Sequence, residues 1–128
     1  MNPNDARIRR IYTRKQGGAI VDESLAVADP NELVVEWEAG AQLNSLGVDL
    51  TLVVVTRNVV TGLNEPAPLS QSVVVTTNGA NANTGYAQVI VIPANTLTAN
   101  VMYESIGCLV RGLSQIHSFS NWWLFLGI

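Results

Sequence analysis

The 128-residue sequence predicts an all-β sandwich, and three observations carry this prediction. Short segments rich in β-branched and aromatic residues recur at regular spacing. Turn signals such as Asn78-Gly79 separate them. Apolar residues at helical spacing occur nowhere for long. At 13.8 kDa, the chain is long enough for one domain with its own core.

The clearest strand covers residues 33–38, where apolar and polar residues alternate. Leu33, Val35 and Trp37 share one face. Glu36 and Glu38 share the opposite face, which we expect to be solvated or to form an interface. The further expected strands cover a short segment at 19–21 or 25–27, and then residues 48–57, 72–77, 86–92, 102–113 and 116–126.

The connections between these strands carry residues that interrupt a sheet. Residues 39–47 are expected to form a loop, and Pro66 and Pro68 keep residues 61–68 out of any central strand. Asn78-Gly79 begins a loop of small residues that extends to Gly85. The sequence therefore predicts about seven strands, arranged as two packed sheets.

Charge divides the chain into two parts. The first fifteen positions have a net charge of +4, from five bases and the single acid Asp5. Residues 16–128 carry two bases, Arg57 and Arg111, against nine acids, which gives −7. We therefore expect an extended basic N-terminal arm and linker over residues 1–31, with Gly17-Gly18 as a swivel, and a sandwich over residues 32–128.

The basic arm has two interpretations. It is either a solvated, disordered tail or a segment that folds when it docks on a partner. In the second case, arginines bind carboxylates and apolar side chains anchor the arm. The candidate partner-binding residues of the arm are Arg7, Ile8, Arg9, Arg10, Ile11, Tyr12, Arg14 and Lys15.

The composition favours burial against other protein. Charged residues make up 13% of the chain, against about 25% in typical soluble domains. Apolar runs stay far below the roughly 20 residues that span a bilayer, and no signal peptide is expected. Several strands are apolar on both faces, which predicts a covered outer face and a homo-oligomer. The acidic body argues against nucleic acid as a ligand, and neither a membrane nor a small-molecule substrate is expected.

No credible catalytic or metal site emerges from the sequence. Glu36 and Glu38 flank a core tryptophan on a strand face, without a cleft for a substrate. Cys108 is expected to be a small core residue, and His117 an ordinary edge or interface residue. One histidine and one cysteine exclude the usual zinc ligand sets. We therefore expect no enzyme activity, no cofactor and no metal.

The last strand carries the residues that most invite an interaction. Trp122 and Trp123 are adjacent, so that their side chains point to opposite faces of a strand. Phe125 shares the face of Trp123. A protein interface is the favoured role for Trp122, Trp123 and Phe125, because tryptophan is enriched at such interfaces. Core packing and sugar stacking are the alternatives.

A resemblance to a known fold lies in residues 92–103. The segment Ile92-Pro93-Ala94-Asn95-Thr96-Leu97-Thr98-Ala99-Asn100-Val101-Met102-Tyr103 resembles the E–F corner of fibronectin type III and related immunoglobulin-like domains. The resemblance implies that Leu97 packs inward and that the hydroxyl of Tyr103 caps the corner. Trp37 resembles the core tryptophan of the fibronectin-type domains. An immunoglobulin-like sandwich is thus expected, but this fold hosts many functions.

These features together resemble, in type, the small bacteriophage capsid cement (decoration) proteins. The corresponding hypothesis is a virion structural protein on the capsid surface, made in the host cytoplasm. It would bind other virion proteins, such as the major capsid protein, through many weak symmetric contacts. The alternative hypothesis is a receptor- or carbohydrate-binding module of a phage tail or a cell-surface adhesin.

Overall fold

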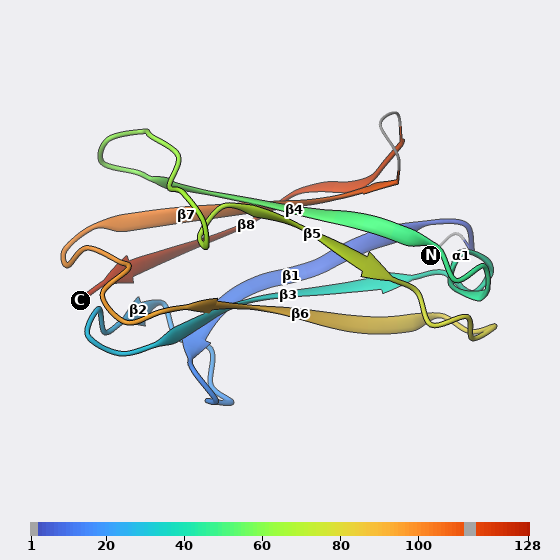
Figure 1. Cartoon of the computed structure of the whole chain (residues 1–128), viewed down its shortest axis with the longest axis horizontal. Helices are drawn as coiled ribbons and strands as arrows, with labels where there is room; N and C mark the ends of the chain where they lie inside the picture. The colour runs from blue at the N-terminus through green and yellow to red at the C-terminus, as the bar shows by residue number, and fades with distance from the viewer. Residues whose placement is uncertain (1–2, 112–114) are drawn as a thin grey trace.

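The structure is a computed structural model that describes residues 3–111 and 115–128, the latter without the side chains of 115–121. Two sheets pack face to face (Figure 1). The three-stranded sheet has the order β1 (Ala6–Lys15), β3 (Asn31–Ala39) and β6 (Thr84–Ile92). The five-stranded sheet has the order β2 (Ser24–Leu25), β8 (Gln115–Gly127), β7 (Met102–Arg111), β4 (Asp49–Asn58) and β5 (Gln71–Thr76).

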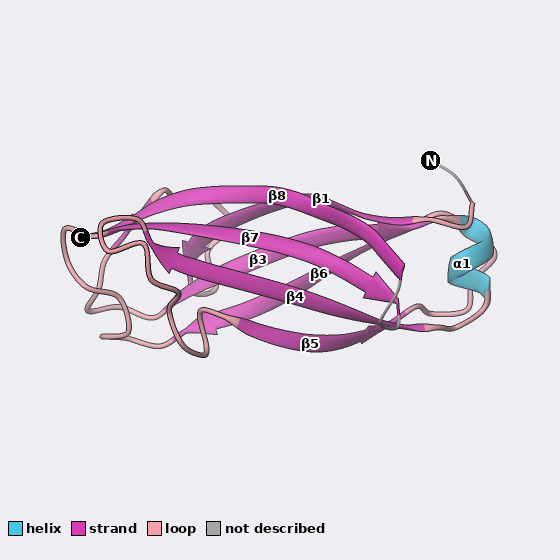
Figure 2. Ribbon diagram, turned by 90° about the horizontal axis from the view of Figure 1, so that it is seen from above, coloured by secondary structure: helices cyan, strands magenta, loops and turns pink. Residues whose placement is uncertain are grey.

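The core forms between the two sheets because alternate residues of each strand point inward. Leu33, Val35 and Trp37 of β3 are almost completely buried, as their alternation predicts. Leu52 and Val54 of β4 face them from the five-stranded sheet. Figure 2 shows this sheet lying across the three-stranded one. The prediction of an all-β sandwich is therefore confirmed.

The corner before β7 fixes the class of sandwich. Leu97 is buried, and Tyr103 is 1% exposed. The hydroxyl of Tyr103 accepts a hydrogen bond of 2.8 Å from the backbone N–H of Thr98. This is the geometry that the resemblance implied. Together with the two-sheet topology, it makes the fold an immunoglobulin-like β-sandwich.

A short helix closes one end of the sandwich where the sequence predicts only a loop. Helix α1 (Ala41–Ser45) follows β3 directly. Its Asn44 is fully buried and donates through its side-chain amide to Asn78 Oδ1, Ala80 O and Thr84 Oγ1. The buried side-chain amide of Asn44 thereby has hydrogen-bond partners.

The structure corrects the expected arm and the boundary at residue 31. Residues 6–15 form β1, which pairs antiparallel with β3 along its whole length. Ile8 and Ile11 are buried in the core of the same chain. The ten residues of β1 combine apolar and charged side chains, and they are stabilised as a strand because the sandwich itself supplies the apolar surface and the carboxylates. The sandwich therefore begins at Ala6.

The other strands lie close to their expected positions. The short strand expected at 19–21 or 25–27 is β2, which pairs in parallel with the end of β8. The expected strand 102–113 ends as β7 at Arg111, and its last two positions lie outside the described residues. His117 lies within β8, but its side chain is outside the description.

Candidate interaction surface

The three aromatic residues of β8 have three different environments. Phe125 is 1% exposed and stacks on Tyr103 in the core, with ring centroids 5.4 Å apart. Trp123 packs against the core, and its indole N–H donates to Thr13 Oγ1 at 2.9 Å. Trp122 points the other way and is 58% exposed. Of the three predicted interface residues, only Trp122 is thus available to a partner.

Trp122 lies on an apolar row that crosses the outer face of the five-stranded sheet. In this sheet, Val55 of β4 is opposite Ile106 of β7, and Ile106 is opposite Trp122 of β8. All three side chains point outward and are at least 36% exposed. Neighbouring strands lie about 4.8 Å apart, so the row extends roughly 10 Å.

A polar row runs beside this apolar row. Arg57 of β4 is opposite Glu104 of β7, and Glu104 is opposite Leu124 of β8. Arg57 Nε donates to Glu104 Oε1 at 2.9 Å. Because diagonal neighbours on a sheet lie about 7 to 8 Å apart, Glu104 is within reach of a large side chain such as Trp122. We call Val55, Arg57, Glu104, Ile106, Trp122 and Leu124 the Trp122 face.

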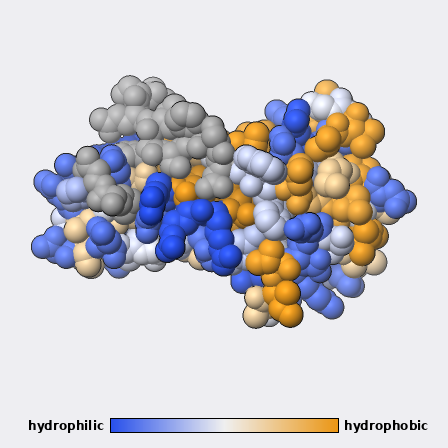
Figure 3. Space-filling view, turned by 180° about the vertical axis from the view of Figure 1, so that it is seen from behind, coloured by the Kyte–Doolittle hydropathy of each residue, from blue (hydrophilic) through white to orange (hydrophobic). Residues whose placement is uncertain are grey.

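Further apolar side chains are exposed at one end of the molecule. Seen from behind, the half that lies opposite α1 carries much apolar surface (Figure 3). The loop between β4 and β5 contributes Val60 and Leu63, each more than two-thirds exposed. Ile128 at the C-terminus and Ile20 before β2 are also exposed. These residues lie in loops and at the chain terminus, whereas the residues of the Trp122 face lie on paired strands.

The basic residues predicted to bind a partner instead pair mostly with β3. Arg10 Nε donates to Glu36 at 2.6 Å, and Arg14 Nε to Glu32 at 2.7 Å. Arg7 forms the third ion pair, with Glu38. These cross-strand pairs form a ladder on the outer face of the three-stranded sheet.

Tyr12 lies within this ladder rather than on a partner. Its ring lies 4.5 Å below the guanidinium of Arg10, and its hydroxyl donates to Glu36 at 3.3 Å. Hydrogen bonding to Arg10 holds the pKa of the Glu36 carboxyl below its usual value. Lys15 is exposed at the end of β1.

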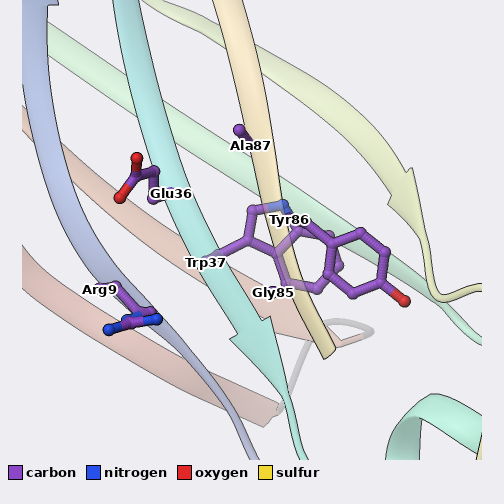
Figure 4. A pocket seen from close by; sticks show the side chains of 6 residues that line it. All are labelled: Arg9, Glu36, Trp37, Gly85, Tyr86 and Ala87. Carbon is purple, nitrogen blue, oxygen red and sulfur yellow. The ribbon is translucent and has the colours of Figure 1, made fainter. Parts of the chain in front are cut away.

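Arg9 occupies a β-bulge, because the register of β1 on β3 shifts between Ile8 and Arg10. Its guanidinium lies 4.0 Å from Glu38. It borders a hollow of about 340 Å³ that Glu36, Trp37, Gly85, Tyr86 and Ala87 also line. Figure 4 shows the rings of Trp37 and Tyr86 lying over one another, and their centroids are 4.3 Å apart. The small residues of β6 leave this hollow open.

Two further kinds of chemical group in the described part of the chain are possible metal ligands and the single cysteine. This part of the chain contains no group of three or more histidine, cysteine or acidic residues that could hold a metal ion. Cys108 is partly exposed on the outer face of β7, which corrects the prediction of a core position. Desolvation raises the pKa of its thiol, so the reactive thiolate is disfavoured. No helix in the described residues is long and apolar enough to cross a membrane.

Sequence reasoning found Trp122 but missed its neighbours. Arg57 and Glu104 lie 47 positions apart and meet only through the register of β4 on β7. The apolar outer side of β4 near Val53 and Val55 was the available signal, since it indicated a sheet face with a use beyond solvation. It could not show which polar residues adjoin that face.

No protein-family model matches the sequence. No curated protein matches it either. The fold is similar to part of a glycosyl hydrolase family 2 member from Bacteroides cellulosilyticus DSM 14838, with a TM-score of 0.58 and 12% identity. This match covers 98% of the present chain and 16% of the other.

A second solved structure gives the same result. It is a protein from Bacteroides fragilis provisionally assigned as a beta-galactosidase, with a TM-score of 0.55 and 11% identity. The match covers 96% of the present chain and 17% of the other. At these identities the likeness establishes the fold, and the present chain spans about a sixth of either protein.

Proposed function

We propose that this protein is a non-catalytic binding module that recognises carbohydrate on its Trp122 face. The observation that carries the proposal is the pairing of an exposed tryptophan with the Arg57–Glu104 ion pair on one outer sheet face. Sugar rings have apolar C–H faces that stack on an indole and hydroxyl groups that need polar partners. The Trp122 face offers an indole for stacking and, on neighbouring strands, polar side chains for the hydroxyl groups.

Arg57 can donate hydrogen bonds to the hydroxyl groups of a sugar, and Glu104 can accept hydrogen bonds from them. Arg57 uses Nε for Glu104 and has further N–H donors, while the second carboxylate oxygen of Glu104 can accept. Because the two groups already hold one another, little side-chain freedom is lost when a ligand binds. The sequence alone favoured a protein interface for Trp122, and the Arg57–Glu104 pair beside it adds the polar groups that a sugar ligand needs.

The two similar structures support the same proposal through the kind of protein in which the fold occurs. Both belong to proteins described as glycoside-processing enzymes, in which a sandwich of this shape forms about a sixth of the chain. The capsid hypothesis depended on a basic arm that is free to bind a partner. Residues 6–15 of that segment instead form β1, which pairs with β3. A receptor- or carbohydrate-binding role therefore has better support than a cement role.

The test is affinity electrophoresis of the whole chain through gels containing a panel of soluble polysaccharides. We expect retardation by at least one polysaccharide and its loss in Trp122→Ala. Leu46→Ala is the matched control, because Leu46 is a similarly exposed apolar residue at the end of α1, outside both the Trp122 face and β6. Equal retardation of the wild type and Trp122→Ala, or retardation by none of the polysaccharides, would overturn the proposal.

A further inference from the structure

Strand β6 is an open edge of the three-stranded sheet. In the described part of the chain it pairs only with β3, and its other side has no neighbouring strand. The nine residues of β6 include no charged side chain. An edge of this length presents a row of unpaired backbone N–H and C=O groups that can pair with another strand.

The opposite edge of the same sheet shows how an edge is normally protected. Strand β1 carries four arginines, a terminal Lys15 and a bulge at Arg9. Charged side chains and bulges hinder edge-to-edge pairing. Strand β6 has neither, and its register on β3 continues through nine consecutive pairs without a shift. The β1 edge of this sheet is thus protected against pairing with another strand, and the β6 edge is not.

We propose that two copies of this chain dimerise by antiparallel pairing of their β6 strands, with the two-fold axis at Gln88. In this register, Gly85 lies opposite Val91 of the second copy, and Ala87 opposite Val89. The two valines are exposed in the single chain, and the two small residues border the open hollow. Large side chains of each copy therefore lie beside small residues of the other.

The inward-facing residues of β6 suit the same register. Tyr86 lies opposite Ile90 of the second copy, which brings an aromatic and a β-branched side chain together. Gln88 lies opposite its own symmetry mate, where one amide can donate to the other. The three-stranded sheets of the two copies would then join into one continuous six-stranded sheet. Such an interface is isologous and closes as a dimer.

Strand β5 is the competing site, since it is also an uncharged edge. It has six residues against the nine of β6, so it offers fewer backbone pairs and a smaller side-chain contact to a second copy. The longer and self-complementary β6 is the favoured edge. The dimer interface is independent of the Trp122 face, which lies on the other sheet.

Sedimentation velocity of the whole chain over a wide concentration range tests the proposal. We expect a monomer–dimer equilibrium that Val89→Lys weakens by at least about tenfold, because it places like charges near one another at the centre of the pairing. Val74→Lys makes the same substitution on β5 and should leave the equilibrium unchanged. A monomer at every concentration, or a dimer sensitive to Val74→Lys and insensitive to Val89→Lys, would overturn the proposal.

A cross-linking experiment tests the register. In a Cys108→Ser background, Gln88→Cys puts one cysteine on the two-fold axis. Residues directly opposite one another in antiparallel strands have Cα atoms about 4.5 to 5.5 Å apart, which a disulfide can bridge. We expect mild oxidation to yield a covalent dimer efficiently. No covalent dimer, or an equal yield from Val74→Cys in the same background, would contradict the two-fold axis at Gln88.

Discussion

Tyr103 is the residue whose role follows most directly from the sequence. It joins three parts of the sandwich, because its ring stacks on Phe125 of β8 and its hydroxyl holds the corner before β7. The hydroxyl satisfies the N–H of Thr98 in a partly buried place. Without it, this donor would be left unpaired.

Removing the hydroxyl alone should therefore be costly. We expect Tyr103→Phe to lower the free energy of unfolding by about 1 to 2 kcal/mol while keeping the ring stacked. Urea unfolding followed by fluorescence measures the change. Tyr12→Phe is the control, since its hydroxyl makes a longer hydrogen bond of 3.3 Å near the surface. Equal effects of the two substitutions would contradict the role of the corner.

Residue roles were predictable where the information is local. Leu97 lies in the turn before β7 and Tyr103 near the start of that strand, so the resemblance of one short segment to a known corner implied both roles. Arg57 and Glu104 belong to strands that only the folded sheet brings together. Their place beside Trp122 depends on the register of three strands, which a single sequence does not fix.

Among the elements, β1 departs most from the sequence prediction. A regular strand places every second side chain on one face, but Ile8 and Ile11 are three positions apart. The bulge at Arg9 absorbs the extra residue, so that both isoleucines point into the core. The sequence pattern therefore lacked the regular alternation of a strand, and the charge of the segment pointed to an arm.

The ladder between β1 and β3 makes this element sensitive to acid. The folded pKa of Glu36 lies below its ordinary value near 4.5, so Glu36 stabilises the folded state at neutral pH. This contribution is lost as the pH falls below about 4.5 and through the folded pKa. Glu36 is partly exposed, and we expect less than about 1 kcal/mol.

Glu36→Gln should accordingly flatten the acid side of the stability profile. Thermal unfolding between neutral pH and pH 3 measures this slope. Glu65→Gln is the control, because Glu65 lies in the connection between β4 and β5, away from β1. An unchanged slope in Glu36→Gln would mean that the ladder does not contribute to stability.

At the scale of the whole molecule, β1 is a structural part of the sandwich. It contributes Ile8 and Ile11 to the core, and Thr13 accepts the hydrogen bond from Trp123 on the opposite sheet. We expect a chain that lacks residues 1–15 to lose its cooperative unfolding transition, because the edge of β3 and the parts of β7 and β8 that β1 covers would be exposed. Circular dichroism during heating checks this. A truncated chain with native β-sheet signal and a sharp transition would show that β1 is dispensable.

The fold as a whole was predictable, because the spacing of strands and turns is a property of the entire chain. The function was less predictable, because this sandwich fold serves many functions and the residues of the Trp122 face are far apart in the sequence. The two proposed surfaces also lie on different sheets. Carbohydrate binding on the Trp122 face and pairing through β6 can therefore occur in the same molecule.

The most direct test of the carbohydrate proposal is nuclear magnetic resonance of the three tryptophan indole N–H groups during titration with a retained polysaccharide. Trp37 is buried and Trp123 is hydrogen bonded to Thr13, so that only Trp122 offers an exposed indole. We expect the Trp122 signal and the amides of Glu104 and Ile106 to shift and to saturate together. Saturating shifts confined to β6 or the three-stranded sheet, with the Trp122 signal unmoved, would contradict the account.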